Sequence, residues 1–453
     1  MSFVATDPAT GHQFAELPDT SREQVADMVE DAHRALHVEH EWRHPLTRAK
    51  ALTNLARRIE AEERVLAELE TRDTGKPLTQ STADVNATVR YLDYYAGSIE
   101  RLEGRQIPLG PDIVDYTVRE PWGVCAQIVP WNYPLQITSR CAAPALAAGN
   151  AVIVKPSELA SVTPLRFAEF AEDAGVPRGM IQVATGDGTT GAALAQHPGV
   201  DHVTFVGSAA TGARVAEVCA RRLAPIELEL GGKSPNVVFA DANLDKAIPA
   251  IVNALIQNAG QSCSAGTRLL VERHALYDVT RLLTKALEKV TIGPGIEDHQ
   301  LGPLISQRQL ERAMRMLEDA RAAGAHVIGG EHRNGLFLTP ALVTNVTPDM
   351  EIFGEEVFGP VLTASAFDSD GDAIALANAT PYGLVAGVWT SDLSRAHRVA
   401  AGIRAGQIFV NTYGVGGGVE LPFGGMKRSG IGRGKGIEAL LAYSQVKNVC
   451  IAL

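Results

Sequence analysis

The sequence predicts an α/β fold with two parallel α/β domains and a small β arm. Short apolar strands at 124–129, 150–154, 180–184 and 202–206 are followed by helical patterns at 163–174 and 189–196. A second series follows, with strands at 236–239 and 267–271 and helices at 244–259 and 274–290. Strands that alternate with helices at this spacing indicate parallel sheets with crossover helices. At roughly 150 residues per domain, 453 residues also exceed one hydrophobic core.

The first hundred residues are predicted to be helical. Apolar residues recur at three-to-four spacing in 22–36, 47–70 and 81–100, within a helical region that runs from 21 to about 103. The more polar stretch 105–119 is typical of a hairpin or arm. The apolar end of the chain, 444–452, is a predicted strand that needs a sheet to join, and a partner subunit could supply it. The glycine-rich run 414–418 is too short for a linker.

Composition excludes several classes of partner. The formal net charge of −11 would repel a phosphate backbone, so we expect no nucleic-acid partner. No stretch reaches the ~18 apolar residues of a membrane span. The five cysteines are an odd number without a CxxC pair, and the N-terminus lacks a basic flank before an apolar run. Both observations favour a reducing, cytoplasmic location. Without HExxH or a metal-ligand spacing, we expect no metal site.

Two glycine clusters lie between a strand and a helix. GDGTTG at 186–191 fits the GxGxxG pattern, and GSAATG at 207–212 adds a serine at a helix N-terminus, where anions bind favourably. A dinucleotide site and ordinary strand-to-helix turns both explain them. KPSE at 155–158 directly follows a strand, where open α/β sheets bind ligands, although an exposed helix-capping turn would look the same.

Two residues are candidates for catalysis. Cys263 stands in GQSCSAG at 260–266, among small and polar neighbours, whereas Cys125, Cys219 and Cys450 lie in apolar runs typical of inert buried thiols. Glu229 ends the strand pattern IELELGGK at 226–233 and shares a strand face with Glu227. A carboxylate in this apolar setting could act as a base, whereas Glu227 fits a solvated position better.

Seven motifs now point to a family. They occur in one order along the chain: WNYP (131–134), KPSE (155–158), FVGS (205–208), LELGGK (228–233), GQSC (260–263), EVFGP (356–360) and PFGG (422–425). In these motifs and their order the chain resembles the aldehyde dehydrogenase superfamily along essentially its whole length. The resemblance implies an aldehyde dehydrogenase-like fold with an NAD-binding domain (1–102 and 122–230), a catalytic domain (231–442) and an oligomerisation arm (103–121 and 443–453). It also implies a homodimer or homotetramer.

The resemblance implies oxidation of an aldehyde to its carboxylate with NAD. Cys263 would attack the aldehyde, and the thiohemiacetal would lose hydride to give a thioester. Asn132 and the Cys263 N–H would form the oxyanion hole, and Glu229 would activate the water that hydrolyses the thioester. Tyr133 would contact the substrate. A glutamate at this position also argues against a CoA-acylating enzyme.

The cofactor residues follow from the same resemblance. Lys155 and Glu158 would hold the adenosine ribose, Gly207 and Ser208 the pyrophosphate, and Glu356 the nicotinamide ribose. The full predicted cofactor set is Trp131, Lys155, Ser157, Glu158, Gly188, Gly207, Ser208, Gly212, Leu230, Glu356 and Phe358. Because the Glu158 carboxylate would repel a 2′-phosphate, it favours NAD, with NADP still open.

Two positions depart from the family pattern. Cys141 stands where many members have a lysine linked to proton relay, and Arg140 stands where many have an aromatic wall. Arg140 could hold the carboxylate of a semialdehyde substrate, although Gln257 replaces the second arginine of such enzymes. It could equally be a salt-bridged surface residue. The alternatives are therefore a semialdehyde dehydrogenase using NAD or NADP, and an inactive binding protein that keeps the fold.

Overall fold

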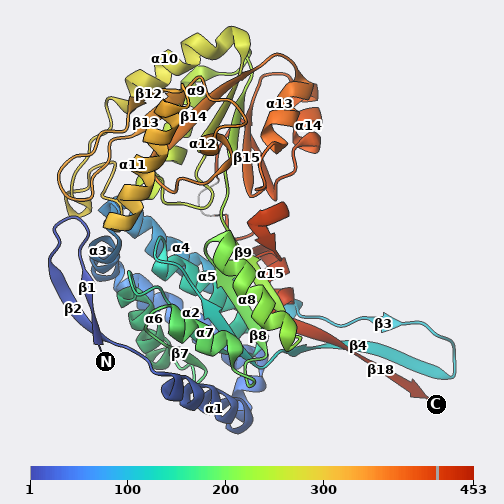
Figure 1. Ribbon diagram of the computed structural model, residues 1–453. Coiled ribbons are helices and arrows are strands. Elements are labelled where there is room, and N and C mark those ends of the chain that lie inside the picture. Colours follow the sequence, from blue (N-terminus) through green and yellow to red (C-terminus); the bar gives the residue numbers. More distant parts are fainter. Residues whose placement is uncertain (1, 415–417) are drawn as a thin grey trace.

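The computed structural model describes residues 2–414 and 418–453, so most of the glycine-rich run lies outside the described residues. Figure 1 shows two α/β lobes, one above the other, and a β arm that extends away from them. The predicted fold class, two parallel α/β units with a small β arm, is confirmed. Within the described residues, no helix is both long and apolar enough to cross a membrane.

The first lobe contains a six-stranded sheet in the order β17-β9-β8-β5-β6-β7, parallel except for β17. Helix α5 packs on one face and α8 on the other, and helices α2 to α4 form an outer layer beyond α5. The strands are β5 (Val124–Ile128), β6 (Ala151–Lys155), β7 (Ile181–Val183), β8 (His202–Val206), β9 (Ile226–Glu229) and β17 (Gly430–Ile431). The helices are α1 (Arg22–Val38), α2 (Pro45–Ala61), α3 (Glu63–Thr74), α4 (Leu78–Ala96), α5 (Pro134–Ala148), α6 (Val162–Asp173), α7 (Gly188–Gln196), α8 (Ala209–Arg221) and α15 (Gly436–Ala442).

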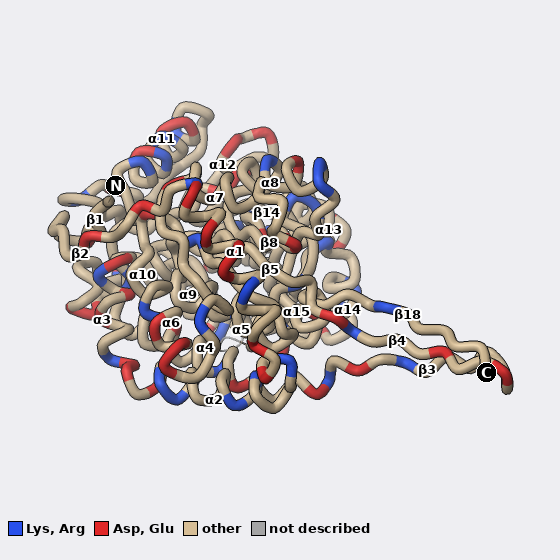
Figure 2. The backbone as a smooth tube through the Cα atoms, turned by 90° about the horizontal axis from the view of Figure 1, so that it is seen from below, with Lys and Arg blue, Asp and Glu red and all other residues tan. Residues whose placement is uncertain are grey.

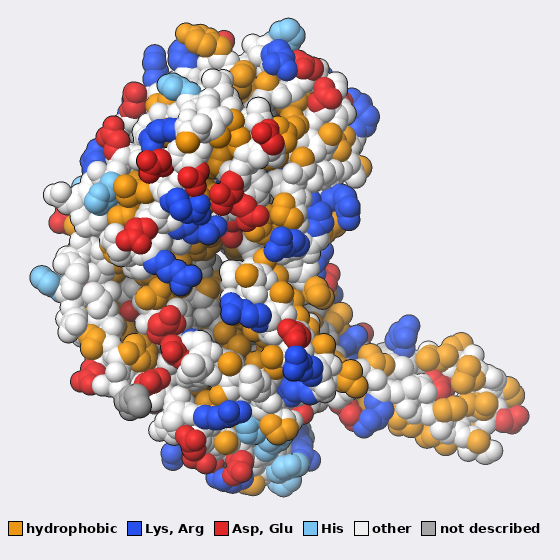
Figure 3. Space-filling view, viewed as in Figure 1, with side chains coloured by type: hydrophobic (Ala, Val, Ile, Leu, Met, Phe, Trp, Pro, Cys, Tyr) orange, Lys and Arg blue, Asp and Glu red, His pale blue; other side chains and the backbone are white. Residues whose placement is uncertain are grey.

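The second lobe contains a seven-stranded sheet in the order β12-β13-β14-β11-β10-β15-β16, parallel except for β12. Its strands are β10 (Pro235–Val238), β11 (Arg268–Glu272), β12 (His326–Gly329), β13 (Ala341–Thr344), β14 (Val361–Phe367), β15 (Val385–Trp389) and β16 (Gln407–Val410). Its helices are α9 (Leu244–Ile256), α10 (Leu276–Leu287), α11 (Gln307–Ala322), α12 (Glu351–Gly354), α13 (Asp370–Asn378) and α14 (Leu393–Gly402). Figure 3 shows the surface hollowed between the two lobes.

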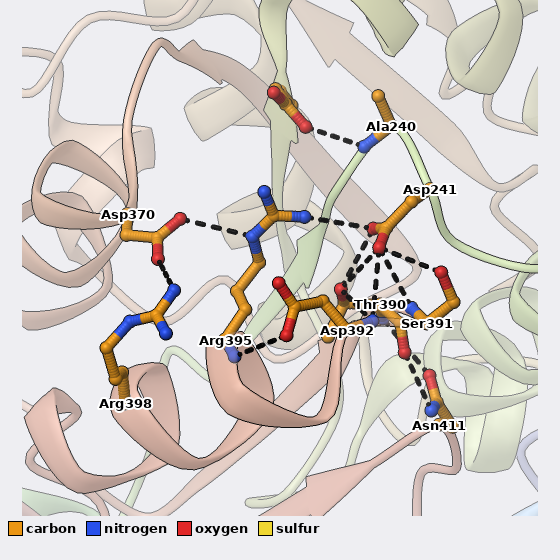
Figure 4. A network of polar contacts seen from close by, with 10 residues as sticks. Ala240, Asp241, Asp370, Thr390, Ser391, Asp392, Arg395, Arg398 and Asn411 are labelled. Carbon is orange, nitrogen blue, oxygen red and sulfur yellow. Dashed lines mark hydrogen bonds and ion pairs between the residues drawn. The ribbon is translucent and has the colours of Figure 1, made fainter.

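A polar network fixes one end of the second sheet (Figure 4). Asp241, just after β10, accepts hydrogen bonds from the hydroxyls of Thr390 and Ser391, each at 2.9 Å. Arg395 on α14 bridges Asp241 and Asp370, with N···O distances of 3.3 and 3.2 Å. The network therefore ties the β10 and β15 ends to helices α13 and α14.

The chain returns to the first lobe before it ends. Strand β17 pairs antiparallel with β9, so that Gly430 lies opposite Glu229, and α15 packs against α5. Ala439, Leu440 and Tyr443 are buried in the first lobe's core. Residues 430–442 thus lie with the first lobe, although the sequence analysis placed them in the unit 231–442. The reason is that β17 completes the edge of the first sheet.

The arm is a three-stranded antiparallel sheet in the order β18-β4-β3 (Figures 1 and 2). It consists of β3 (Gln106–Ile107), β4 (Ile113–Pro121) and β18 (Ser444–Ala452), so the terminal strand joins the arm of its own chain. Cys450 is exposed on β18, and the expectation that it is buried is wrong, because the arm protrudes from the core. A separate hairpin, β1 (Ser2–Thr6) and β2 (Gln13–Pro18), begins the chain.

Two predicted helices differ from the structure. The helix expected over 47–70 is divided at Glu62 into α2 and α3. The helix expected over 244–259 ends at Ile256, because Asn258 and Ala259 have positive φ values of 46° and 53°. This second difference shapes the loop that carries Cys263.

Candidate active site

The candidate site lies where four parallel strands of the first sheet end. Asn132 follows β5, Lys155 ends β6, Ser208 follows β8 and Glu229 ends β9. The chain runs outward from β5 through β6 and β7, then returns to β8 on the other side of β5. The crevice at such a reversal of strand order is where open α/β sheets bind their ligands.

The loop that carries Cys263 is held by an unusual backbone. Asn258, Ala259 and Gly260 are consecutive residues with positive φ. A Cβ at Gly260 would lie 2.3 Å from the carbonyl carbon of Gly359, so only glycine allows this approach. The close contact brings the 260–263 loop onto the segment that follows Phe358.

Asn132 is fixed beside this loop by two hydrogen bonds. The Nδ2 of Asn132 donates to the backbone oxygen of Gln261 at 3.0 Å. The Nδ2 of Asn258 donates to the backbone oxygen of Asn132 at 2.8 Å. The Asn132 side chain is buried. An asparagine amide carries two N–H donors, so one of them remains for a substrate oxygen. The structure thus brings Asn132 within two residues of Cys263.

Cys263 is partly exposed and packs against a small apolar cluster that includes Phe423 and Tyr413. Burial raises the pKa of its thiol to about 11; the Arg140 guanidinium opposes this shift, whereas the Glu229 carboxylate adds to it. The sulfur is therefore mainly a thiol at neutral pH.

Glu229 is buried and ion-paired. Its side chain is 3% exposed, and Arg140 Nη2 on α5 donates to its Oε2. Glu227 is also buried, on the same face of β9, whereas Leu228 and Leu230 pack with Phe205 on the other. The predicted alternation is confirmed. The expectation of a solvated Glu227 is wrong, because the backbone at 432–434 covers both carboxylates.

The two carboxyl groups titrate abnormally. Burial raises the pKa of Glu229, and the positive charge of Arg140 opposes the rise. Burial together with the charge of Glu229 raises the pKa of Glu227 to about 8, again opposed by Arg140. Two acids in one low-dielectric site compete for ionisation, so Arg140 determines how much negative charge the site can hold.

Arg140 is not the surface residue considered in the sequence analysis, since it is 6% exposed and lies over the ring of Phe423 at 5.3 Å. One of its nitrogens already contacts Glu229, which leaves the substrate-carboxylate role a hypothesis. Cys141 is buried, and burial raises the pKa of its thiol to about 12. Tyr133, the other predicted substrate residue, lies beneath the ammonium of Lys76, 4.3 Å from the ring centre.

The predicted nicotinamide-side residues form one cluster. Gly232 N–H donates to Glu356 Oε1 at 3.1 Å, and a Cβ at Gly231 would lie 2.2 Å from Glu356 Oε2. Trp131 and Phe358 meet edge-to-face, with 5.4 Å between ring centres. Burial raises the pKa of Glu356 to about 7. A carboxylate acceptor against a glycine turn, two residues from the paired ring of Phe358, fits a ribose with its attached ring.

The adenosine-side residues lie along the ends of β6 and β8. Lys155 is buried, and its Nζ lies 3.7 Å from Glu158 Oε2, while Glu158 itself is exposed. Ser208 caps the 13-residue helix α8 through Thr211 N–H. A helix N-terminus beside a buried lysine and an exposed carboxylate fits the pyrophosphate and ribose of a dinucleotide.

Four more predicted positions border the same edge. A Cβ at Gly212 would lie 2.6 Å from Leu230 Cδ2, which explains why small and large residues are paired there. Gly188 begins α7, and a Cβ there would meet nothing within 4 Å. Ser157 donates to Glu158 at 3.3 Å. The open space beside Gly188 suits its predicted place in the cofactor set.

Some residues of the site were missed by sequence reasoning. Gln261 fixes the nucleophile loop, because its Nε2 donates to Asn258 O at 3.0 Å and its Oε1 accepts from Ile305 N–H at 2.9 Å. The motif GQSC contains this glutamine, so its position next to the cysteine was a usable signal. Lys435, whose charge lowers the pKa values of both Cys263 and Glu229, had no such signal.

The comparisons with known proteins agree with this geometry. The model of the "Aldehyde dehydrogenase family" matches residues 1–449. Human 4-trimethylaminobutyraldehyde dehydrogenase is 39% identical over 99% of this chain and 92% of its own length. A solved structure of a candidate aldehyde dehydrogenase from Burkholderia cenocepacia is 45% identical, with a TM-score of 0.98 over 100% of this chain and 96% of that one. The NAD⁺ complex of an aldehyde dehydrogenase from Bacillus cereus is 38% identical, with a TM-score of 0.98 over 100% and 94%. The chain therefore belongs to the aldehyde dehydrogenase family.

Proposed function

We propose that this chain oxidises an aldehyde to its carboxylate with NAD and water, using Cys263, Asn132 and Glu229. The observation that carries the proposal is their convergence: the Asn132 amide binds the loop of Cys263, and Cys263 and Glu229 each interact with Arg140. Nucleophile, oxyanion donor and base are the groups that acyl chemistry on a cysteine requires.

The ionised fraction of Cys263, a thiolate that has lost its proton to solvent, adds to the carbonyl carbon, and the carbonyl oxygen becomes an oxyanion. The free N–H of the Asn132 amide and the Cys263 backbone N–H donate to that oxygen, and each donor of this kind contributes about 3 kcal/mol. NAD bound to the residues assigned below would supply the hydride acceptor that conversion of the thiohemiacetal to a thioester requires. Glu229 then takes a proton from water, the water oxygen attacks the thioester carbon, and the C–S bond breaks to release the thiolate and the carboxylic acid, which loses its proton to solvent.

We assign the nicotinamide half of NAD to Trp131, Leu230, Glu356 and Phe358. The adenosine half is assigned to the residues along β6, α7 and α8, namely Lys155, Ser157, Glu158, Gly188, Gly207, Ser208 and Gly212. The exposed Glu158 carboxylate supports NAD over NADP, because a 2′-phosphate would meet a like charge. Rates of NADH and NADPH formation at equal cofactor concentration test this preference.

The substrate class follows less directly from the site. A curated relative is named for 4-trimethylaminobutyraldehyde, so a polar aldehyde of this length belongs in any substrate panel. A semialdehyde would need the guanidinium of Arg140, which is paired with Glu229. We therefore propose an aldehyde without a carboxylate, and a panel that also contains succinic semialdehyde would show which side chain the pocket accepts.

Replacing the nucleophile tests the reaction. Cys263→Ala should abolish NADH formation while NAD binding, followed by titration calorimetry, stays largely intact, since the sulfur is not in the assigned cofactor set. Cys219→Ala, a buried thiol on α8, is the matched control and should retain activity. Substantial NADH formation by Cys263→Ala would contradict the assignment.

Replacing the base separates the two halves of the reaction. Glu229→Gln should form the thioester and then stop, because a neutral amide cannot take the proton from water. Intact-mass measurement after mixing with NAD and aldehyde should show the acyl adduct. Normal turnover without an adduct would place the base elsewhere.

We further propose a cytosolic homo-oligomer that assembles through the arm. All five cysteines are free, which suits a reducing compartment. Strand β18 is the edge of its sheet, so its outer hydrogen-bonding groups are available to another copy.

A further inference from the structure

Arg140 and Glu229 form a buried ion pair near Cys263. The reaction described above gives Arg140 no role. We propose that Arg140 is a positioning residue that keeps Glu229 ionised and fixes one of its oxygens, leaving the other for the water that hydrolyses the thioester. The proposal rests on the proposed role of Glu229 as the base and adds the residue that makes a buried base usable.

The need for a cation follows from the crowding of acids at this strand end. Glu227 and Glu229 point to the same face of β9, and their side chains are almost fully buried. A Cβ at Gly434 would lie 2.0 Å from Glu229 Oε1 and 3.2 Å from Glu227 Oε1, so both carboxylates approach the same backbone. Glu227, whose pKa is about 8, binds a proton at neutral pH even with Arg140 in place, and without that positive charge Glu229 would bind one as well.

Arg140 is held so that its charge reaches the pair. It projects from the first half of α5, its guanidinium lies over Phe423, and its Nη2 donates to Glu229 Oε2. Glu229 Oε1 is buried and has no fully formed hydrogen bond among the described residues; the Gly434 N–H lies close enough to lower the pKa of the carboxyl group, but a carboxylate oxygen can accept a further donor. One oxygen is therefore occupied by the arginine and the second is available to a water.

Other titratable and charged groups surround the pair. Glu227 lies on β9, Arg140 and Cys141 on α5, and Cys263 on the nucleophile loop. Tyr91 and Tyr95 lie on α4, and Arg433 and Lys435 lie in the segment after β17. Arg433 is engaged elsewhere, since it donates to the backbone oxygens of Gly432 and Gly425. Arg140 donates directly to the Glu229 carboxylate.

The proposal predicts a defined change in pH dependence. Hydrolysis needs Glu229 ionised, so the rate falls as the pH drops through the pKa of that group. Burial raises this pKa and Arg140 lowers it, so removing the arginine must move the acidic limb to higher pH.

The experiment measures kcat against pH at saturating aldehyde and NAD for the wild type and Arg140→Gln. We expect the acidic limb of the Arg140→Gln profile to lie higher than that of the wild type by about one pH unit or more. Below the limb kcat should fall at least tenfold relative to the wild type, and at alkaline pH kcat should recover. The Arg140→Gln variant should still form the same acyl adduct as the wild type and should still hydrolyse it, but slowly. The matched control is Arg48→Gln, a buried arginine that donates to Ala147 O on the same helix without an acid partner; its limb should not move.

Two further variants keep the test decisive. Arg140→Lys retains the charge and should restore the limb toward the wild-type position. If Arg140→Gln does not fold, Glu227→Gln is compared with the double variant Glu227→Gln/Arg140→Gln, in which one competing acid is gone. The double variant should have the higher limb.

The proposal is overturned if the acidic limbs coincide in the wild type and Arg140→Gln, or in Glu227→Gln and the double variant. Glu229→Gln distinguishes this failure from failure of the function: if that variant traps the acyl-enzyme while the Arg140 variants leave the limb unmoved, Glu229 is the base and only the role of Arg140 is wrong. If Glu229→Gln turns over normally, the proposed base is wrong.

Discussion

The chemistry of a single sulfur determines how the enzyme responds to pH before any substrate binds. Burial raises the pKa of Cys263 to about 11, opposed by Arg140 and Lys435, so the reactive thiolate is a small fraction at neutral pH. Alkylation of Cys263 by iodoacetamide should accelerate about tenfold per pH unit between pH 7 and 10.

Peptide mass spectrometry would measure this alkylation with a built-in reference, because Cys450 on β18 is exposed and reacts in the same tube. Arg140→Gln should slow the labelling of Cys263 relative to Cys450, since a positive charge that favours the thiolate is lost. A rate for Cys263 that levels off below pH 9 would show a thiol more acidic than its surroundings imply.

At this scale the sequence indicated which residues to propose for catalysis, but not which groups surround them. Alternation along β9 placed Glu227 and Glu229 on one face. It could not show that Glu227 is buried, because the covering backbone at 432–434 lies far away in the sequence. Likewise, the pattern of α5 identified a helix, yet only the packing of α5 against β9 shows that Arg140 meets Glu229.

The elements were predictable where local pattern decides them. The terminal strand, the parallel strands expected between 124 and 271 and the crossover helices between them follow from apolar periodicity, whereas strands β13 to β16 were not predicted. The break at Glu62 between α2 and α3 did not, since no glycine or proline marks it and buried residues continue on both sides. The end of α9 at Ile256 was also missed, because tertiary contacts hold Asn258, whose N–H donates to Gln80 Oε1 at 2.8 Å.

The turn after β17 is an element whose shape controls the base. A methyl group at Gly434 would lie 2.0 Å from Glu229 Oε1, so Gly434→Ala should push the carboxylate away from its position. We expect the slow hydrolysis phase to lose at least about tenfold, a change of about 1.4 kcal/mol in the barrier, while the first turnover of NADH persists. Stopped-flow absorbance at 340 nm separates the two phases.

A glycine without such a neighbour is the control for that change. A Cβ at Gly371 on α13 would meet only Ser369 Oγ, at an ordinary 3.7 Å, so Gly371→Ala should leave both phases unchanged. Equal hydrolysis rates in Gly434→Ala and the wild type would mean that the base tolerates displacement at this turn.

At the scale of the whole molecule, the two lobes supply different parts of the proposed active site. The first lobe contributes Asn132, Glu229 and the adenosine side, and the second contributes Cys263 and Glu356. The chain crosses between the lobes after Leu230 and crosses back before β17. Strand β9, which carries the proposed base, therefore lies between β8 and β17, two strands that are far apart in the sequence. Neither lobe alone would assemble nucleophile and base.

The arm serves a separate purpose, which its surface indicates. Apolar side chains remain exposed along it, with Val446 56% and Ile451 44% exposed, and Figure 3 shows hydrophobic side chains gathered on its outer part. An exposed edge strand with apolar side chains is a template for pairing with another chain. Deleting residues 444–453 should therefore convert an oligomer into monomers, as measured by sedimentation velocity.

The double variant Val446→Asp/Ile451→Asp tests the same surface without shortening the chain, because two buried charges at an interface without partners disfavour association. Leu46→Asp, at an exposed leucine on α2, is the matched control and should leave the sedimentation coefficient unchanged. Since the assigned site residues come from the two lobes of one chain, the first turnover of NADH per site should persist in the monomer. An arm variant that sediments like the wild type would show that subunits associate through another surface, or that the wild type is itself a monomer.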